Sequence, residues 1–129
     1  MKLEECTKMW QLLGLALEDL KKAESKENVE VRMSVWVKQE GTMCYCCMAG
    51  AILMDEGITS VAEISRDIWN RIETIDFLRR GWVREAYHRF TGRWDSNLYF
   101  LNIKSYISDH TGFMKDMEDL YAYLKERDI

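Results

Sequence analysis

The residues with the most evident chemistry are four cysteines, three of which lie within four positions of one another. Cys44, Cys46 and Cys47 form the run Cys-Tyr-Cys-Cys, whereas Cys6 lies far from them in the sequence. Zinc sites usually combine two closely spaced cysteines with a second, distant pair of ligands. The chain has no recognisable second pair, so we predict no metal site. We expect reduced, buried thiols that pack as small apolar groups.

Cys46 and Cys47 are also candidates for a catalytic nucleophile. A cysteine at the start of a helix has its thiolate favoured by the helix dipole, and Cys47 is predicted to lie there. Cysteine catalysis also needs a histidine base. His88 and His110 are the two histidines of the chain, and neither has a spacing that favours this role. Phosphate-binding glycine loops and the serine nucleophile elbow are absent from the sequence. We therefore expect no catalytic residues and no cofactor, with a cysteine-dependent enzyme as an alternative.

The clearest compositional anomaly is a concentration of arginine in residues 66–93. Seven of the nine arginines lie there, with no lysine and four acidic residues, so the segment has a net charge of +3. Guanidinium groups bind carboxylates and phosphates through two parallel hydrogen bonds, and they stack on aromatic rings. The candidate binding residues are the arginines and aromatic residues that alternate near the end of this segment: Arg80, Trp82, Arg84, Tyr87, Arg89, Arg93 and Trp94.

Two interpretations of these arginines remain open. They form a solvated face that pairs with nearby acids or with the acidic C-terminal helix, or they bind an acidic or phosphate-bearing partner. Their alignment depends on Gly81. A helix continuous through Gly81 would place Arg80, Arg84 and His88 on one stripe, whereas a break would leave only Arg84 and His88 aligned. The nearby acids are Glu73, Asp76 and Glu85.

Hydrophobic periodicity predicts the helices that must position these residues. Apolar residues recur at helical spacing in several segments, and capping residues such as Ser65 or Asp67 support the predicted starts. Glycines end three of them, at Gly57, Gly81 and Gly92. The pattern of residues 95–108 fits a strand, a helix or a packed loop equally well, and His110 belongs to a run typical of a helix start. The predicted helices cover residues 2–22, 47–54, 68–78, 83–90 and 113–124.

Residues 29–46 predict a β-hairpin. Valines alternate with polar residues over 29–38, residues 39–41 form a plausible turn, and 42–46 form the return strand. Gly50, which follows the hairpin between two alanines, permits either tight packing against a neighbouring backbone or contact with a ligand.

Composition limits the class of protein. Of 129 residues, 47% are apolar and 31% are charged, which excludes a disordered chain. No apolar stretch approaches the ~18 residues of a membrane span, and the charged N-terminus predicts no secretory signal. A net charge of −4 provides no general basic field for nucleic acid. We expect one helix-rich α+β domain over residues 1–129, in which a small β-hairpin packs against about four or five helices.

Two short motifs lie within residues 29–57. They are Met33-Ser34-Val35-Trp36, and the pattern C-x-A-G-A from Cys47 to Ala51 within the run Cys44–Met54. Together they resemble a group of small, uncharacterised proteins encoded by tailed bacteriophages, in which a strand ending in Met-Ser-Val-Trp precedes such a helix start. The resemblance implies an accessory phage protein that acts in the host bacterial cytoplasm. It carries over no activity and no catalytic residues.

We therefore expect a non-enzymatic phage accessory protein that binds and modulates a host protein, such as a defence, nuclease or transcription component. Arg80, Trp82, Arg84, Tyr87 and Trp94 are expected at the contact surface, because interfaces favour Trp, Tyr and Arg. One alternative is a binder that sequesters a nucleotide-like or other anionic small molecule. Exposed aromatic residues would favour a homodimer interface as readily as an interface with a foreign partner. We expect no membrane and no nucleic-acid partner.

Overall fold

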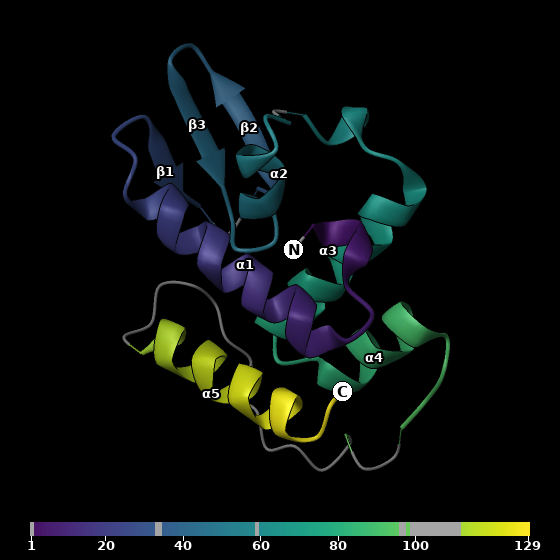
Figure 1. Cartoon of the computed structure of the whole chain (residues 1–129). Helices are drawn as coiled ribbons and strands as arrows, with labels where there is room; N and C mark the ends of the chain where they lie inside the picture. The colour runs from purple at the N-terminus through teal and green to yellow at the C-terminus, as the bar shows by residue number, and fades with distance from the viewer. Residues whose placement is uncertain (1, 33–34, 59, 96–97, 99–111) are drawn as a thin grey trace.

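The computed structural model of the chain describes residues 2–32, 35–58, 60–95, 98 and 112–129 (Figure 1). In these residues, five α-helices and a three-stranded sheet confirm the predicted helix-rich α+β class. The elements in chain order are η1 (Leu3–Glu5), α1 (Met9–Glu24), β1 (Val29–Val31), β2 (Val37–Glu40), β3 (Met43–Cys46), α2 (Ala51–Asp55), η2 (Val61–Glu63), α3 (Arg66–Arg79), α4 (Val83–Thr91) and α5 (Phe113–Glu126).

Helix α1 carries the buried leucine stripe that its periodicity predicts. The prediction that this helix begins at Lys2 is wrong, because a short 3₁₀ turn comes first and α1 begins at Met9. The side chain of Gln11 explains the later start. Its Oε1 accepts hydrogen bonds from the backbone N–H groups of Thr7 at 2.7 Å and Lys8 at 3.2 Å. These bonds fix the chain just before the first helical turn, where N–H groups otherwise lack partners.

The sheet corrects the prediction of one continuous strand over residues 29–38. β1 and β2 are separate strands on opposite sides of β3, with β1 parallel and β2 antiparallel to it. The Arg32 N–H donates to the Cys46 carbonyl oxygen at 2.8 Å, and the Cys47 N–H donates to the Trp36 carbonyl oxygen at 3.2 Å. The chain therefore crosses from one edge of β3 to the other. An alternating pattern identifies extended residues, but it does not show where pairing changes sides.

The predicted hairpin is formed by β2 and β3. Glu40 pairs with Met43, so the turn consists of Gly41 and Thr42, whereas a turn over residues 39–41 was expected. On β3, Cys44 and Cys46 are buried, while the residues between and beside them are partly exposed. The strand thus presents its two thiols to the core, as strand alternation requires.

Gly50 lies where two backbone segments meet. A β carbon at this position would overlap the carbonyl oxygen of Trp36. Of the two interpretations of this glycine, tight backbone packing is the one that the structure confirms. The expected helix start at Cys47 is wrong, because residues 47–50 form a turn and α2 begins at Ala51.

Helices α3 and α4 hold the arginine-rich segment, and local signals set their ends. The Ser65 hydroxyl accepts a hydrogen bond from the Ile68 N–H at 3.3 Å and so caps α3. Gly81 has a φ of 79°, a left-handed conformation that glycine adopts without strain, and it separates the two helices. The alternative of one helix continuous through Gly81 is wrong. Of Arg80, Arg84 and His88, only Arg84 and His88 therefore lie one turn apart on the same helix.

Helix α1 crosses the centre of the molecule, with the sheet and α2 on one side and α5 on the other (Figure 1). Gly14 allows the close approach of α1 and α5, because a β carbon there would lie 2.7 Å from Tyr121 Cε2. Most of the segment 95–108, and His110, lie outside the described residues. None of the helices in the described part of the chain is long and apolar enough to cross a membrane.

Asp19 is a buried carboxyl group on α1, on the side that faces α2. The residue is 3% exposed, and its Oδ1 lies 3.6 Å from Lys22 Nζ. Burial raises the pKa of Asp19 to about 6, with a further contribution from the negative charge of Asp55. The folded protein therefore holds this proton more tightly than the unfolded chain does.

We expect Asp19→Asn to stabilise the protein in a pH-dependent way. Because the pKa is raised in the folded state, Asp19 contributes stability that is complete below about pH 4 and is lost as the pH rises through about 6. The substitution should change the free energy of unfolding little at pH 4 and raise it by on the order of 2 kcal/mol at pH 7.5. Urea denaturation at both pH values measures the effect. Glu18→Gln, one position away on the exposed side of α1, is the control and should show a much weaker dependence, because the Glu18 charge is only a minor cause of the raised pKa of Asp19.

Candidate functional site

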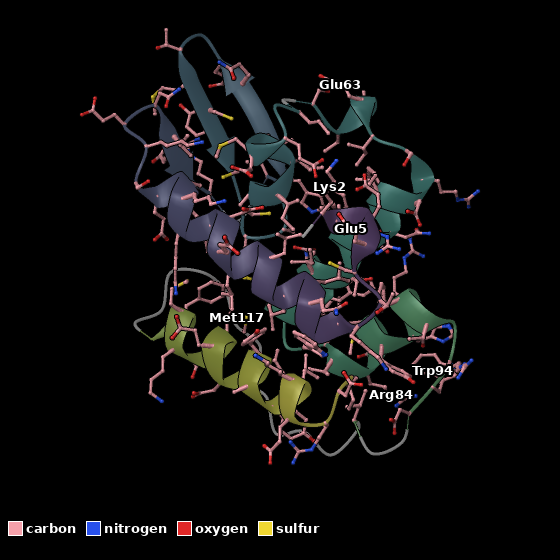
Figure 2. All side chains as sticks on the ribbon, in the orientation of Figure 1. Lys2, Glu5, Glu63, Arg84, Trp94 and Met117 are labelled. Atoms are coloured by element: carbon pink, nitrogen blue, oxygen red, sulfur yellow. The ribbon has the colours of Figure 1, made fainter. Side chains whose placement is uncertain are left out.

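The arginine and tryptophan side chains predicted from the sequence gather around α4, and Figure 2 shows Arg84 and Trp94 close together there. Large apolar side chains that are exposed are few in the described residues: Val61, Trp69, Trp82 and Trp94. Trp82 is 44% exposed and Trp94 is 56% exposed, and both flank α4. We use the name α4 face for the two arginine–tryptophan pairs beside α4, which are Arg80 with Trp82 and Arg84 with Trp94.

Trp94 is held in place by two side chains from α4. The Arg84 guanidinium carbon lies 4.7 Å from the centre of the indole ring. The His88 ring stacks on the same indole with a centroid distance of 3.9 Å and an angle of 5°. The buried His88 Nδ1 has no hydrogen-bond partner among the described residues. Arg84 and His88 lie one turn apart on α4, so together they hold the exposed ring of Trp94 in a fixed orientation.

Trp82 is held in the same way at the junction of α3 and α4. Its ring packs on Phe77 with a centroid distance of 5.6 Å, and the Arg80 guanidinium carbon lies 5.2 Å from the ring centre. Arg80 also donates from Nε to Asp76 at 3.2 Å. Each exposed tryptophan of the α4 face is therefore paired with one arginine.

Other arginines of the segment make ion pairs within the protein, as the first of the two interpretations predicts. Arg89 pairs with Glu73 at 2.9 Å, and Arg79 pairs with Asp76 at 2.8 Å. Arg71 donates through Nη1 to the carbonyl oxygens of Leu3 and Cys6. These contacts tie α3 to α4 and to η1, so part of the positive charge of residues 66–93 is neutralised internally. Arg89 is thus paired within the protein, and we do not include it in the α4 face.

Tyr87 and Arg93 also lie apart from the α4 face, on the wall of a cavity of about 290 Å³. Arg93 makes no ion pair with the described residues, and the Tyr87 hydroxyl makes no hydrogen bond with them. The rest of the wall comes from the start of α1 and the chain after α5, and the cavity is lined by Thr7, Lys8, Met9, Tyr87, Phe90, Thr91, Arg93, Asp128 and Ile129.

The four cysteines are all buried and free of disulfides. Burial raises the pKa of Cys46 to about 12 and that of Cys47 to about 11, so both thiols are protonated at neutral pH. The expected helix dipole does not act on Cys47, because α2 begins four residues later. The described residues contain no group of three or more metal-ligating side chains arranged around one point. These thiols pack the core beneath β3 and α2, and we assign them no nucleophilic role.

Sequence reasoning missed the residues that come together only through the tertiary fold. Lys8 lies far from Arg93 in the chain, yet both line the same cavity. Trp36 and Trp69 form a second aromatic pair with a centroid distance of 4.7 Å, and Trp69 is 39% exposed. No local sequence pattern predicts the shared cavity wall or the Trp36–Trp69 contact, because each joins residues from separate elements of the fold.

Asp76 and Arg79 form a buried ion pair, whereas the first interpretation of the arginines placed Asp76 among the acids of a solvated face. They are 6% and 5% exposed, respectively. Their spacing of three positions on a helix is compatible with an ion pair, but it does not reveal that the pair is buried.

Comparison of the chain with models of protein families, with curated proteins and with solved structures finds no match.

Proposed function

We propose that this chain is a non-enzymatic accessory protein of a tailed bacteriophage that binds and modulates a host protein in the bacterial cytoplasm. The observation that carries the proposal is the α4 face, where two exposed tryptophans are each held beside an arginine. Tryptophan and arginine are the residues most enriched among the energetic anchors of protein interfaces.

The α4 face has the physical properties of a prepared contact surface. Covering the exposed half of a tryptophan side chain is worth roughly 2 kcal/mol. Trp82 and Trp94 already have fixed orientations, because Phe77 and His88 pack on their rings. Binding of a partner therefore loses little side-chain conformational entropy, because these two rings are already ordered.

The partner that fits is a protein surface with carboxylates around an apolar recess. The segment 66–93 has a net charge of +3 within a chain of net charge −4. Arg80 is shared with Asp76, and Arg89 is paired with Glu73, so the local surface is only mildly positive. This favours directional pairing with a few carboxylates over attraction to a nucleic-acid backbone.

The phage origin is supported by the resemblance within residues 29–57, and this segment does not form the α4 face. Met48, Ala49 and Ile52 are buried, and they belong to the packing around β3 and α2. The resemblance therefore supports an origin and a framework, while the function is argued from α4.

The test is capture of a partner from bacterial lysate by the immobilised protein and by three variants. Trp94→Ala and Arg84→Gln alter the α4 face, whereas Trp69→Ala removes a comparably exposed tryptophan elsewhere. We expect a protein retained by the wild type and by Trp69→Ala to be lost with the other two. With the purified partner, Trp94→Ala should weaken binding by about thirtyfold, as for a typical hot spot. Higher salt should slow association.

Equal retention of the partner by Trp94→Ala and Trp69→Ala would contradict the assignment of the α4 face. Sedimentation supplies a second check. A dimer of this chain that dissociates with Trp94→Ala would replace the host protein with a second copy as the occupant of this face.

A further inference from the structure

We propose that the cavity beside α4 is a binding site for a small molecule that carries both a phosphate group and an aromatic ring, as an aryl phosphate or a nucleotide does. This inference goes beyond the proposed protein contact, because it concerns the cavity lined by Tyr87 and Arg93 and not the α4 face. The cavity lies between the start of α1, the last turn of α4 and the residues after α5.

The cationic side of the cavity is formed by Arg93 and Lys8. Arg93 makes no ion pair with the described residues, unlike Arg79, Arg80 and Arg89 of the same segment. Its backbone is fixed, because its N–H donates to Thr91 Oγ1 at 3.1 Å directly after α4. A guanidinium that has no ion pair in the described part of the chain, on a fixed backbone at a cavity wall, is suited to bidentate contact with a phosphate.

Among the described residues that line the cavity, one acidic side chain opposes these cations. Asp128 lines the same cavity, and its Oδ2 lies 3.6 Å from Lys8 Nζ. Its Oδ1 accepts a hydrogen bond from Trp10 Nε1 at 3.0 Å, so both carboxylate oxygens are already engaged. Asp128 therefore reduces the positive charge of the wall without removing it, and Arg93 remains the group with charge available for a ligand.

The apolar side of the cavity comes from α4. Phe90 and Tyr87 contribute aromatic rings, and the Tyr87 hydroxyl has no hydrogen-bond partner among the described residues. A ligand with a ring and an oxyanion would use both the rings and the cation, whereas inorganic phosphate would use only the cation. The volume of about 290 Å³ lies just below the range for drug-sized small-molecule sites, roughly 300–1,000 Å³, so the cavity suits a small ligand.

The backbone at the start of α1 contributes little to this site. The N–H groups of Thr7 and Lys8 are bonded to Gln11, and the Trp10 N–H donates to the Ile129 carbonyl oxygen at 3.0 Å. The predicted affinity therefore depends on the Arg93 side chain and not on the helix N-terminus.

The experiment is a titration followed by amide NMR on the full chain, with phenyl phosphate, AMP, inorganic phosphate and phenol as probes. We expect phenyl phosphate and AMP to shift the amide signals of residues 7–9 and 91–93. Inorganic phosphate should bind more weakly, and phenol should cause little change. Arg93→Gln should weaken phenyl phosphate binding by roughly tenfold or more, as expected for loss of a charged hydrogen bond.

Arg66→Gln is the matched control, because it removes the same charge from an exposed arginine outside the cavity. A second variant, Tyr87→Phe, keeps the ring and removes only the hydroxyl. The site would be overturned if no probe shifts these amides, or if Arg66→Gln weakens binding as much as Arg93→Gln. Equal affinity for inorganic phosphate and phenyl phosphate would overturn the aromatic part of the proposal. None of these variants alters Trp82 or Trp94, so failure here is separable from failure of the proposed function.

Discussion

Asp76→Ala is expected to lower the free energy of unfolding by about 3–5 kcal/mol. Asp76 and Arg79 are almost fully buried, with 2.8 Å between the carboxylate and the guanidinium. Removing the carboxylate leaves the Arg79 charge in a poorly solvated environment without its partner, and the cost of desolvating that charge is no longer offset. Urea denaturation followed by circular dichroism measures the loss.

Two further variants separate this explanation from a general effect of mutating α3. Arg80→Gln removes the half-exposed arginine that also contacts Asp76, and it should cost less than about 1 kcal/mol. The double variant Asp76→Leu/Arg79→Leu should recover most of the loss, because apolar replacement of both members of a buried pair is often neutral. A single Asp76→Ala change no more harmful than Arg80→Gln would contradict a buried, mutually dependent pair.

Gly50→Ala is expected to destabilise the fold by at least about 3 kcal/mol, at the upper end of the range for overpacking. The added methyl group would overlap the Trp36 carbonyl oxygen, which belongs to the backbone and cannot move aside by a side-chain rotation. The same carbonyl oxygen accepts a hydrogen bond from the Cys47 N–H, which joins the first residue of the turn before α2 to the residue before β2. The substitution should therefore displace the turn as well as the strand. Thermal and urea denaturation measure the effect.

Gly41→Ala is the comparison for this prediction. Gly41 has a φ of 59°, with no atom near the position of an added β carbon, so alanine there costs only the strain of the backbone conformation. We expect a loss of about 1–2 kcal/mol. If Gly50→Ala were as mild as Gly41→Ala, the contact between residues 36 and 50 would be looser than the structure shows.

The helices could be predicted from the sequence because their limits depend on nearby residues. Ser65 caps α3 three positions before the N–H that it binds, and Gly81 ends that helix in a left-handed conformation. The sheet could not be predicted in the same way. Whether Val29 and Val37 belong to one strand or two depends on β3, which is later in the chain and pairs with both.

The residues of the candidate site also differ in how far their positions depend on contacts between distant parts of the chain. Arg84 and Trp94 lie close together in the sequence, so composition alone placed both among the candidate binding residues, although it did not predict the contact between them. The cavity depends on contact between α4 and the start of α1, so only Tyr87 and Arg93 of its wall were among the predicted residues. The sequence also does not indicate that the Asp76–Arg79 pair is buried, because the pattern of residues on a helix does not show which part of its surface a neighbouring helix covers.

The central position of β3 has a consequence for the order in which the sheet assembles. β2 and β3 are joined by a two-residue turn, so their pairing closes a very short loop, whereas β1 reaches β3 only after the chain has crossed the sheet. Loop-closure entropy therefore favours early formation of the hairpin, with β1 added afterwards as a parallel edge strand. In the transition state for folding, the β2–β3 turn should be largely native, and the edge made by β1 should be the last part of the sheet to gain protection from hydrogen exchange.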